Sequence, residues 1–206
     1  MIEDVYLLVA ELTSGHRLYL DESSEGSFST IACSDIINYE YSDYHCNLSI
    51  DNSVHLDATL ASSMNVLSSG VFTTIKPLYK DGIYYFYFKN NQGLGSEKRF
   101  NAIDERLQSY LRIGMNNGLI VGFGNLDTPA RFYAYDLQCP NCFDINALPL
   151  RNYELTVNGT GIATCKTCHR TYNLNTGGNI VSGEKGKTMT RYRASTTGPN
   201  GMLHVY

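Results

Sequence analysis

Residues 132–168, FYAYDLQCPNCFDINALPLRNYELTVNGTGIATCKTC, contain the pattern that decides the fold and chemistry of this chain. The segment holds two Cys-x-x-Cys pairs of identical spacing, Cys139-Pro-Asn-Cys142 and Cys165-Lys-Thr-Cys168, separated by 22 residues. Each pair fits a tight turn that points two thiolates at one ion, and the intervening chain is long enough for a hairpin. The sequence therefore predicts one four-thiolate metal site made by Cys139, Cys142, Cys165 and Cys168.

The donor set narrows the choice of metal. Four thiolates select Zn²⁺ or iron over Mg²⁺ and Ca²⁺. They leave no open coordination position, so zinc bound here would be structural rather than catalytic. Zinc is the leading expectation, and a [2Fe–2S] cluster or a rubredoxin-like iron on the same cysteines is the alternative. Disulfides, a redox dithiol and unlinked thiols stay open, although a redox Cys-x-x-Cys usually opens a helix in a βαβ unit.

Three residues beside the pairs are candidates for supporting roles. His169 follows Cys168 directly and is either a further ligand or donor, or a simple turn residue. Asp136 and Asp144 flank the first pair. They could orient a ligand, but surface turn carboxylates are the commoner case.

Short strands dominate the expected secondary structure. We expect one hairpin over 71–88 around Asp81-Gly82, with its first strand ending near Pro77, and a second over 153–164 around Asn158-Gly159. Further short strands are expected at 17–20, 119–123 and 131–135, and around Tyr172, Ile180, Tyr192 and Val205.

Two short helices complete the expected elements. The first covers 55–66, where Asp57 is a candidate cap and apolar residues recur every four positions at Leu56, Leu60 and Met64. The second covers 101–110, with Ile103 and Leu107 four residues apart. Together with the strands, this pattern predicts a mainly β protein.

Composition excludes several classes of protein. The chain has 206 residues, a net charge of −4 and no run of basic residues, so we expect no nucleic-acid partner. Its 16 tyrosines suit half-buried strands, because the ring packs while the hydroxyl reaches water. No apolar run is long enough for a transmembrane helix, and the N-terminus lacks the basic region of a convincing signal peptide.

Residues 1–45 are the least interpretable part of the chain. Cys33 has a small residue before it and polar residues after it, as in a lipid-attachment site, although the upstream segment is unusually charged. An ordinary thiol is the alternative for Cys33. A disulfide between Cys33 and Cys46 is a further possibility if the protein is exported.

The segment 131–206 resembles a Rieske domain. Phe132-Tyr-Ala-Tyr-Asp136 before the first pair resembles the strand entering the first ligand loop, and Cys165-Lys-Thr-Cys168 followed by Tyr172-Asn-Leu-Asn-Thr-Gly-Gly178 resembles the second loop. Residues 46–206 also resemble uncharacterised Rieske-like proteins of the Bacteroidetes envelope. That likeness rests on Asp57-Ala-Thr-Leu-Ala61, Asn117-Gly-Leu-Ile-Val-Gly122, Cys139-Pro-Asn-Cys142 and Arg191-Tyr-Arg-Ala-Ser-Thr-Thr-Gly198.

The resemblance implies an antiparallel β-sandwich or barrel over 46–206, with a small metal-binding β subdomain at about 137–178. It also implies an exported protein of the cell envelope, because members of that group are typically lipoproteins or exported proteins. Two departures matter: Cys142 and Cys168 stand where Rieske centres have histidines, and Glu184 replaces the usual proline of the tail. The scaffold would then hold zinc in place of the cluster.

The leading hypothesis is therefore a non-enzymatic protein with a structural metal and an unknown protein or glycan partner. An electron carrier with iron on the same cysteines is the principal alternative, and a thiol–disulfide oxidoreductase is a third. Gly183–Thr188 ends in Gly-Lys-Thr, but Val181 occupies the position of the first phosphate-loop glycine. That segment is expected to be a glycine turn.

Overall fold

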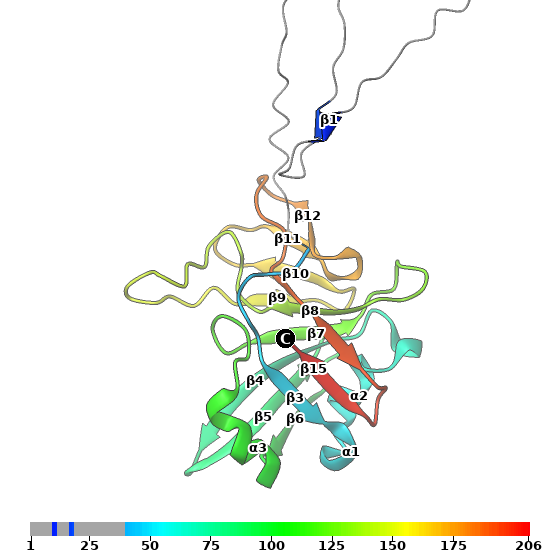
Figure 1. Ribbon diagram of the computed structural model, residues 1–206, viewed down its shortest axis with the longest axis vertical. Helices are drawn as coiled ribbons and strands as arrows, with labels where there is room; N and C mark the ends of the chain where they lie inside the picture. The colour runs from blue at the N-terminus through cyan, green and yellow to red at the C-terminus, as the bar shows by residue number, and fades with distance from the viewer. Residues whose placement is uncertain (1–9, 12–16, 19–39) are drawn as a thin grey trace, which may run out of the picture. The chain divides into compact units, whose positions relative to one another are not determined.

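The computed structural model describes residues 10–11, 17–18 and 40–206. Strands β1 (Ala10–Glu11) and β2 (Arg17–Leu18) pair antiparallel and belong to the first of two compact units. The second unit, residues 39–206, contains every other helix and strand (Figure 1). Cys33 lies outside the described residues, as does part of the strand predicted at 17–20.

Three antiparallel sheets build the second unit, which confirms the mainly β prediction. The largest has six strands in the order β13-β8-β7-β4-β5-β6, and the other two have the orders β12-β11-β10-β9 and β14-β15-β3. The strands of the large sheet are β4 (Phe72–Lys80), β5 (Ile83–Asn90), β6 (Gly95–Arg99), β7 (Leu119–Phe123), β8 (Phe132–Asp136) and β13 (Arg191–Tyr192).

The two smaller sheets come from both ends of the unit. The three-stranded sheet joins the start of the unit to its C-terminus through β3 (Leu48–Asp51), β14 (Ala194–Thr196) and β15 (Met202–Val205). The four-stranded sheet is continuous in sequence and consists of β9 (Leu155–Val157), β10 (Ile162–Cys165), β11 (Thr171–Asn173) and β12 (Asn179–Ser182). Figure 1 shows this sheet at one end of the unit, beside β7 and β8.

Side chains of the central strands alternate between two hydrophobic cores. Leu119, Val121 and Ala134 point into the first core, which lies against α2 and the three-stranded sheet. Ile120 and Tyr135 point into the second core, which contains Cys139 and Cys165 and lies against the four-stranded sheet. Because residues along a strand alternate in direction, β7 and β8 form a wall shared by both cores.

The helix predicted over 55–66 is wrong in its first part. The chain forms α1 (Asn52–His55), α2 (Ala58–Ser63) and the 3₁₀ turn η1 (Val66–Ser68). Asp57 caps α2 as predicted, and Leu60 and Met64 are buried. Leu56 instead ends α1 with a φ of 49° and is 69% exposed, so it does not share their face.

The helix predicted over 101–110 is confirmed as α3 (Ala102–Leu107) followed by η2 (Gln108–Tyr110). Its expected apolar face is not buried, since Ile103 is 54% and Leu107 is 42% exposed. The buried residue is Asp104, which pairs with His55 at 2.9 Å between Oδ2 and Nε2. One further 3₁₀ turn, η3 (Leu174–Thr176), follows β11.

The 71–88 hairpin is confirmed as β4–β5, with both Asp81 and Gly82 at positive φ. The predicted end near Pro77 is wrong, because β4 continues to Lys80. Pairing of β4 with β7 stops at Ile75, so Pro77 has a strand neighbour on one side only. A proline costs little there, since it has no N–H to leave unpaired.

The chain enters the second unit along the β13 edge of the large sheet. The Ser42 N–H donates to the Arg191 carbonyl at 2.8 Å. The carboxylate of Glu40 contacts the guanidinium groups of Arg131 and Arg191, at 2.7 and 3.2 Å. The ring of Tyr41 lies beneath the Arg191 guanidinium. These contacts attach residues 40–42 to β8 and β13.

Candidate metal centre

The first cysteine pair follows β8 after a short buried link. Cys139 is fully buried and opens a tight turn, in which the N–H groups of Cys142 and Phe143 donate to its carbonyl at 3.2 and 2.9 Å. The Cys139 N–H donates to the Tyr153 carbonyl at 2.9 Å. The start of the turn is thereby tied to the segment that leads into β9.

The second pair begins at the last residue of β10, as the predicted hairpin required. The His169 N–H donates to the Cys165 carbonyl at 3.0 Å, and the Cys165 N–H donates to the Arg170 carbonyl at the same distance. His169 has a φ of 58°, the left-handed conformation that glycine adopts most easily. The chain uses histidine at this position to reverse direction after Cys168.

The four sulfur atoms meet at one point. All of them lie within 4.8 Å of one another. The sulfurs of Cys139 and Cys168 are 3.7 Å apart, and those of Cys142 and Cys165 are 3.8 Å apart. Metal–sulfur bonds of about 2.3 Å place the corners of a tetrahedron about 3.8 Å apart. The donor set and its spacing therefore fit a four-coordinate metal ion.

Both of these sulfur contacts join one turn to the other. All four cysteines are free thiols, and a disulfide would need sulfurs about 2.05 Å apart. The disulfide alternative is therefore wrong for this structure.

Two of the clustered thiols, Cys139 and Cys142, resist ionisation unless a cation is present. Burial raises the pKa of Cys139, and burial together with the neighbouring thiols raises the pKa of Cys142. Burial also acts on Cys168, but hydrogen bonds from the backbone and side chain of Arg170 outweigh it and lower the pKa of Cys168 to about 6. A divalent cation would supply the charge that lets all four become thiolates.

Tyr172 and Asn141 support the first turn from outside the cluster. The Tyr172 hydroxyl is 3.3 Å from the Cys139 sulfur and accepts a hydrogen bond from Asn141 Nδ2 at 2.9 Å. Burial raises the pKa of Tyr172, so the hydroxyl keeps its proton and donates it to the sulfur. The sequence pattern predicted a strand at Tyr172 and placed it after the second cysteine pair, but gave it no contact with a cysteine. An amide between the cysteines of a pair was the available signal for Asn141.

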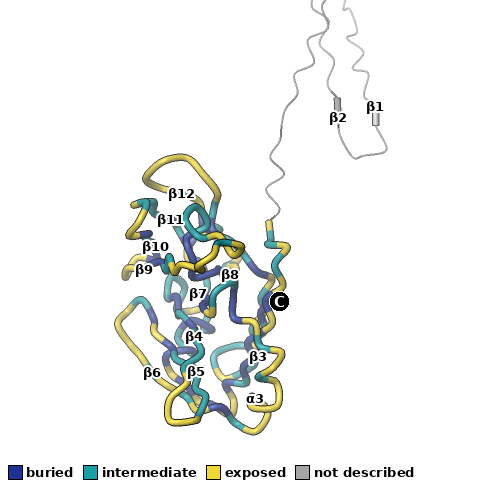
Figure 2. Tube along the Cα trace, turned by 90° about the vertical axis from the view of Figure 1, so that its left-hand side faces the viewer, coloured by how far each residue is buried: buried dark blue, intermediate teal, exposed yellow. Residues whose placement is uncertain are grey.

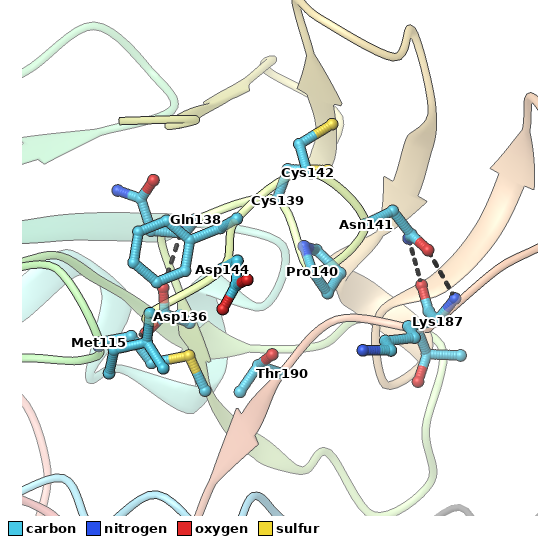
Figure 3. Close-up of a pocket in the computed structure, with 13 residues that line it drawn as sticks. Met115, Asp136, Gln138, Cys139, Pro140, Asn141, Cys142, Asp144, Lys187 and Thr190 are labelled. Carbon is cyan, nitrogen blue, oxygen red and sulfur yellow. Dashed lines mark hydrogen bonds between the residues drawn. The ribbon is translucent and has the colours of Figure 1, made fainter. Parts of the chain in front are cut away.

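Asn141 also holds the glycine turn at 183–188 against the cysteines. Its amide exchanges two hydrogen bonds with the backbone of Lys187, both at 2.8 Å (Figure 3). A Cβ on Gly186 would lie 2.3 Å from Asn141 Oδ1, so only glycine fits there without displacement. The segment rejected as a phosphate loop thus packs beside the first cysteine turn.

The three residues predicted to support the cysteines have different surroundings in the structure. His169 is exposed and is not among the clustered ligands, in line with a turn residue. Asp144 is an exposed turn carboxylate that accepts from the Asn146 N–H at 2.9 Å. Asp136 is neither a surface group nor a cysteine partner, because it is 1% exposed and binds elsewhere.

Asp136 joins three parts of the second unit. Its carboxylate accepts hydrogen bonds from the Met115 N–H at 2.6 Å, the Tyr192 hydroxyl at 2.7 Å and the Gln138 N–H at 2.8 Å. Burial raises the pKa of Asp136, although these three donors oppose the rise. Asp136 therefore positions the chain just before Cys139 and does not touch the sulfurs.

A cleft of about 620 Å³ lies beside the first turn. Met115, Asp144 and Thr190 line it together with the first cysteine pair. In Figure 3 the Cys142 sulfur points away from these three side chains. The Cys142 sulfur is therefore not directed at this part of the cleft.

Cys46 belongs to a different part of the unit. It is a free, buried thiol of the first core and donates to the Arg112 carbonyl at 2.9 Å. The possible disulfide between Cys46 and Cys33 stays a prediction, because Cys33 lies outside the described residues.

No family model, curated protein or solved structure matches this chain. Within the described residues, no helix has both the length and the apolar character to cross a membrane.

Proposed function

We propose that Cys139, Cys142, Cys165 and Cys168 hold one structural zinc ion in a non-enzymatic, Rieske-like protein of the cell envelope. The observation that carries this proposal is the sulfur spacing, in which all four atoms lie within 4.8 Å of one another and two pairs are 3.7 and 3.8 Å apart. Zinc bound by four thiolates supplies folding energy and no open position for a substrate.

The spacing favours a single ion over a [2Fe–2S] cluster. In a two-iron cluster each iron takes two of the four cysteines, so sulfurs on different irons are separated further by the iron–iron distance. Here all four sulfurs lie within 4.8 Å of one another, which leaves no pair separated by the additional iron–iron distance. A single rubredoxin-like iron would fit the same distances and is the principal competitor of zinc.

A structural role agrees with where the cysteines lie. The first turn links β8 to β9, and the second links β10 to β11, so one ion would connect the four-stranded sheet to the large sheet. The strands of the four-stranded sheet have only three or four residues each. Binding of a structural zinc ion is worth on the order of 10 kcal/mol, which would stabilise so small a sheet.

The Rieske-like assignment is supported by the sequence motifs that carry the resemblance. It is also supported by the two cysteine turns, which meet beside a small antiparallel sheet. Cysteines in place of both histidines remove the ligands that raise the potential of a Rieske cluster. The envelope location and an exported state follow from the same resemblance, and the possible lipid on Cys33 follows from the residues on either side of that cysteine. A protein or glycan partner would then bind the exposed surface.

Metal content is the deciding measurement. Purified protein should be colourless and contain about one zinc per chain in native mass spectrometry with elemental analysis. Absorption between roughly 400 and 600 nm together with stoichiometric iron would show that the cysteines hold an electron-transfer iron centre and not zinc. Thiols that react at once without a chelator, with activity in reducing insulin, would support the oxidoreductase instead.

A matched pair of variants shows that the metal sits at this cluster. Cys142→Ser should abolish stoichiometric metal, because one of four ligands is lost. Cys46→Ser should retain the metal, because Cys46 lies in the other core and a serine hydroxyl can still donate to the Arg112 carbonyl. Equal metal content in both variants would sink the proposal.

A further inference from the structure

The connection from β8 to β9 carries exposed aliphatic side chains at its tip. Ile145 is 43%, Leu148 is 96% and Leu150 is 47% exposed. Within the part of the chain that the structure describes, none of the three belongs to either hydrophobic core. Figure 1 shows this connection extending away from the sheets, and Figure 2 shows where the exposed segments of the unit lie. Exposed apolar residues are normally scattered singly, so three of them within one short segment indicate a contact surface. We name residues 144–151 the aliphatic loop.

Hydrogen bonds hold both ends of the aliphatic loop against the first cysteine turn. Just before the loop, the Phe143 N–H donates to the Cys139 carbonyl. Just after it, Gln138 Nε2 donates to Asn152 Oδ1, and the Tyr153 N–H donates to Gln138 Oε1, both at 2.6 Å. Gln138 itself is buried. The tip is therefore presented on a fixed base, which lowers the cost of ordering the loop when it makes a contact.

Unpaired cations lie on both sides of this base. Lys187 lines the cleft of about 620 Å³ together with Ile145, at the start of the loop. Lys166 lines a second cleft, of about 380 Å³, together with Asn152 at the end of the loop. Arg151 follows the tip directly. All three cations are exposed, and none of them takes part in an ion pair within residues 40–206.

The acidic groups of this region are fewer. Residues 137–190 contain five Lys and Arg and three Asp and Glu, in a chain whose net charge is −4. Of the three acids, Glu154 and Glu184 already form ion pairs, and only Asp144 is left. A zinc ion with four thiolates would add two negative charges, which brings the net charge of the region close to zero. The exposed cations therefore act on nearby groups only, and the aliphatic tip must supply most of the attraction.

A lipid surface fits this combination better than a protein partner does. Residues that dominate protein–protein binding are enriched in Trp, Tyr and Arg and are poor in Leu, whereas the tip has aliphatic side chains and no aromatic ring. At a bilayer surface, apolar side chains enter the acyl-chain boundary while Lys and Arg contact the headgroup phosphates. We infer that the aliphatic loop inserts its tip into the surface of a phospholipid bilayer, with Arg151, Lys166 and Lys187 at the headgroups.

The absence of tryptophan from the sequence allows a direct test of insertion. Leu148→Trp, made in the full chain without a lipid on Cys33, places a single indole at the tip. Vesicles of phosphatidylcholine and phosphatidylglycerol should shift its emission to shorter wavelength, and brominated acyl chains should quench it. Leu67→Trp is the matched control, because Leu67 is 90% exposed and lies in η1. Its emission should be the same with and without vesicles.

Cosedimentation with the same vesicles measures affinity without a fluorophore. Leu148→Asp should weaken binding about tenfold or more, because one apolar side chain no longer leaves water. Leu67→Asp should bind like the parent protein. Lys166→Gln and Lys187→Gln should each weaken binding about fivefold at low salt, and high salt should remove this difference. Lys89→Gln, which removes an exposed lysine of β5, should have no effect.

Several results would overturn the inference. The first is an unchanged emission of Leu148→Trp on addition of vesicles, or an equal shift in Leu67→Trp. The second is vesicle binding that Leu148→Asp leaves intact, which would identify a purely electrostatic contact. The third is a shift that appears without vesicles as the protein concentration rises, which would make a second copy of this chain the occupant. All these measurements read the loop and not the metal content, so they can fail or succeed independently of the zinc proposal.

Discussion

Loss of the Tyr172 hydroxyl should weaken metal binding. We expect Tyr172→Phe to lower metal affinity about tenfold, because Cys139 loses its hydrogen-bond donor. The free energy of unfolding should fall by about 1–2 kcal/mol, because the Asn141 amide also loses an acceptor. Competition with a chromogenic chelator measures the affinity, and urea unfolding measures the stability.

Tyr135→Phe is the control for this prediction. The Tyr135 hydroxyl lies in the same core but donates to the Leu174 carbonyl at 2.8 Å. This variant should lose a similar amount of stability and keep the parent affinity for metal. Equal metal affinity in both variants would show that the Tyr172 hydroxyl does not support the cysteine.

His169 tests whether the residue after the second pair is a turn residue or a ligand. His169→Gly should retain the metal and raise the unfolding free energy by up to about 1 kcal/mol, because glycine adopts a φ of 58° without strain. Lys166→Gly, in the same turn, should be neutral or destabilised, because Lys166 is not among the residues at positive φ. Loss of metal from His169→Gly, measured by elemental analysis, would show that His169 is a ligand.

The thiol pKa values predict how metal binding depends on pH. The raised pKa values of Cys139 and Cys142 mean that both thiols hold their protons at pH 7 in the metal-free protein. The pKa of Cys168 is about 6, so that thiol is largely ionised at pH 7. Binding of zinc should therefore release at least about two protons, and affinity should rise with pH.

Calorimetry in buffers of different ionisation enthalpy counts those protons. The expected slope at pH 7 is two or more protons released per metal bound. A slope below one would mean that the thiols are already ionised before the metal arrives.

At the scale of elements, the glycine turn and the first cysteine turn depend on each other. Gly186→Ala should destabilise the protein by about 1–3 kcal/mol, because the new methyl group displaces the Asn141 amide from Lys187. Metal release to a chelator should also become faster. Gly159→Ala is the matched control, since the nearest atom to its Cβ would be 3.8 Å away. Equal unfolding temperatures for the two variants would contradict this coupling.

The elements that the sequence predicted well are those with local causes. The β4–β5 hairpin follows from the positive φ that Asp81 and Gly82 tolerate. The second hairpin is also present, but its loop is longer than the Asn158-Gly159 signal indicates, because Gly161 is the residue at positive φ. In both cases a few neighbouring residues carry the information.

The elements predicted poorly depend on distant residues. The Asn52 side-chain amide binds the backbone of Asp57 and the carbonyl of Pro199. The end of α1 at Leu56 therefore depends on a contact with a residue 147 positions away in sequence. Asp136 is buried because Tyr192 and Met115 supply its donors. The paired spacing predicted which cysteines would meet. The order of the sheets and the Tyr172 contact needed the fold.

At the scale of the molecule, removal of the metal should loosen one core before the other. Chelation should increase amide hydrogen exchange in β9–β12, whose sheet packs on the core that contains the cysteines. Protection in β4, β5 and β15 should persist, because their side chains fill the first core. The stabilisation lost should be on the order of 10 kcal/mol if the whole sheet melts.

Exchange monitored by mass spectrometry with and without chelator separates these regions. Uniform loss of protection would mean that the shared wall of β7 and β8 makes the two cores one cooperative unit. No change anywhere would mean that the metal contributes nothing to the fold.

The contacts of Glu40 and Ser42 with Arg131 and Arg191 have a practical consequence for fragment design. A fragment trimmed to begin at Tyr44 would leave both arginines without their carboxylate, and would expose the hydrogen-bonding edge of β13. Bare strand edges recruit other chains, so such a fragment would tend to self-associate even with its metal in place. Beginning the fragment ahead of Glu40 keeps that edge covered.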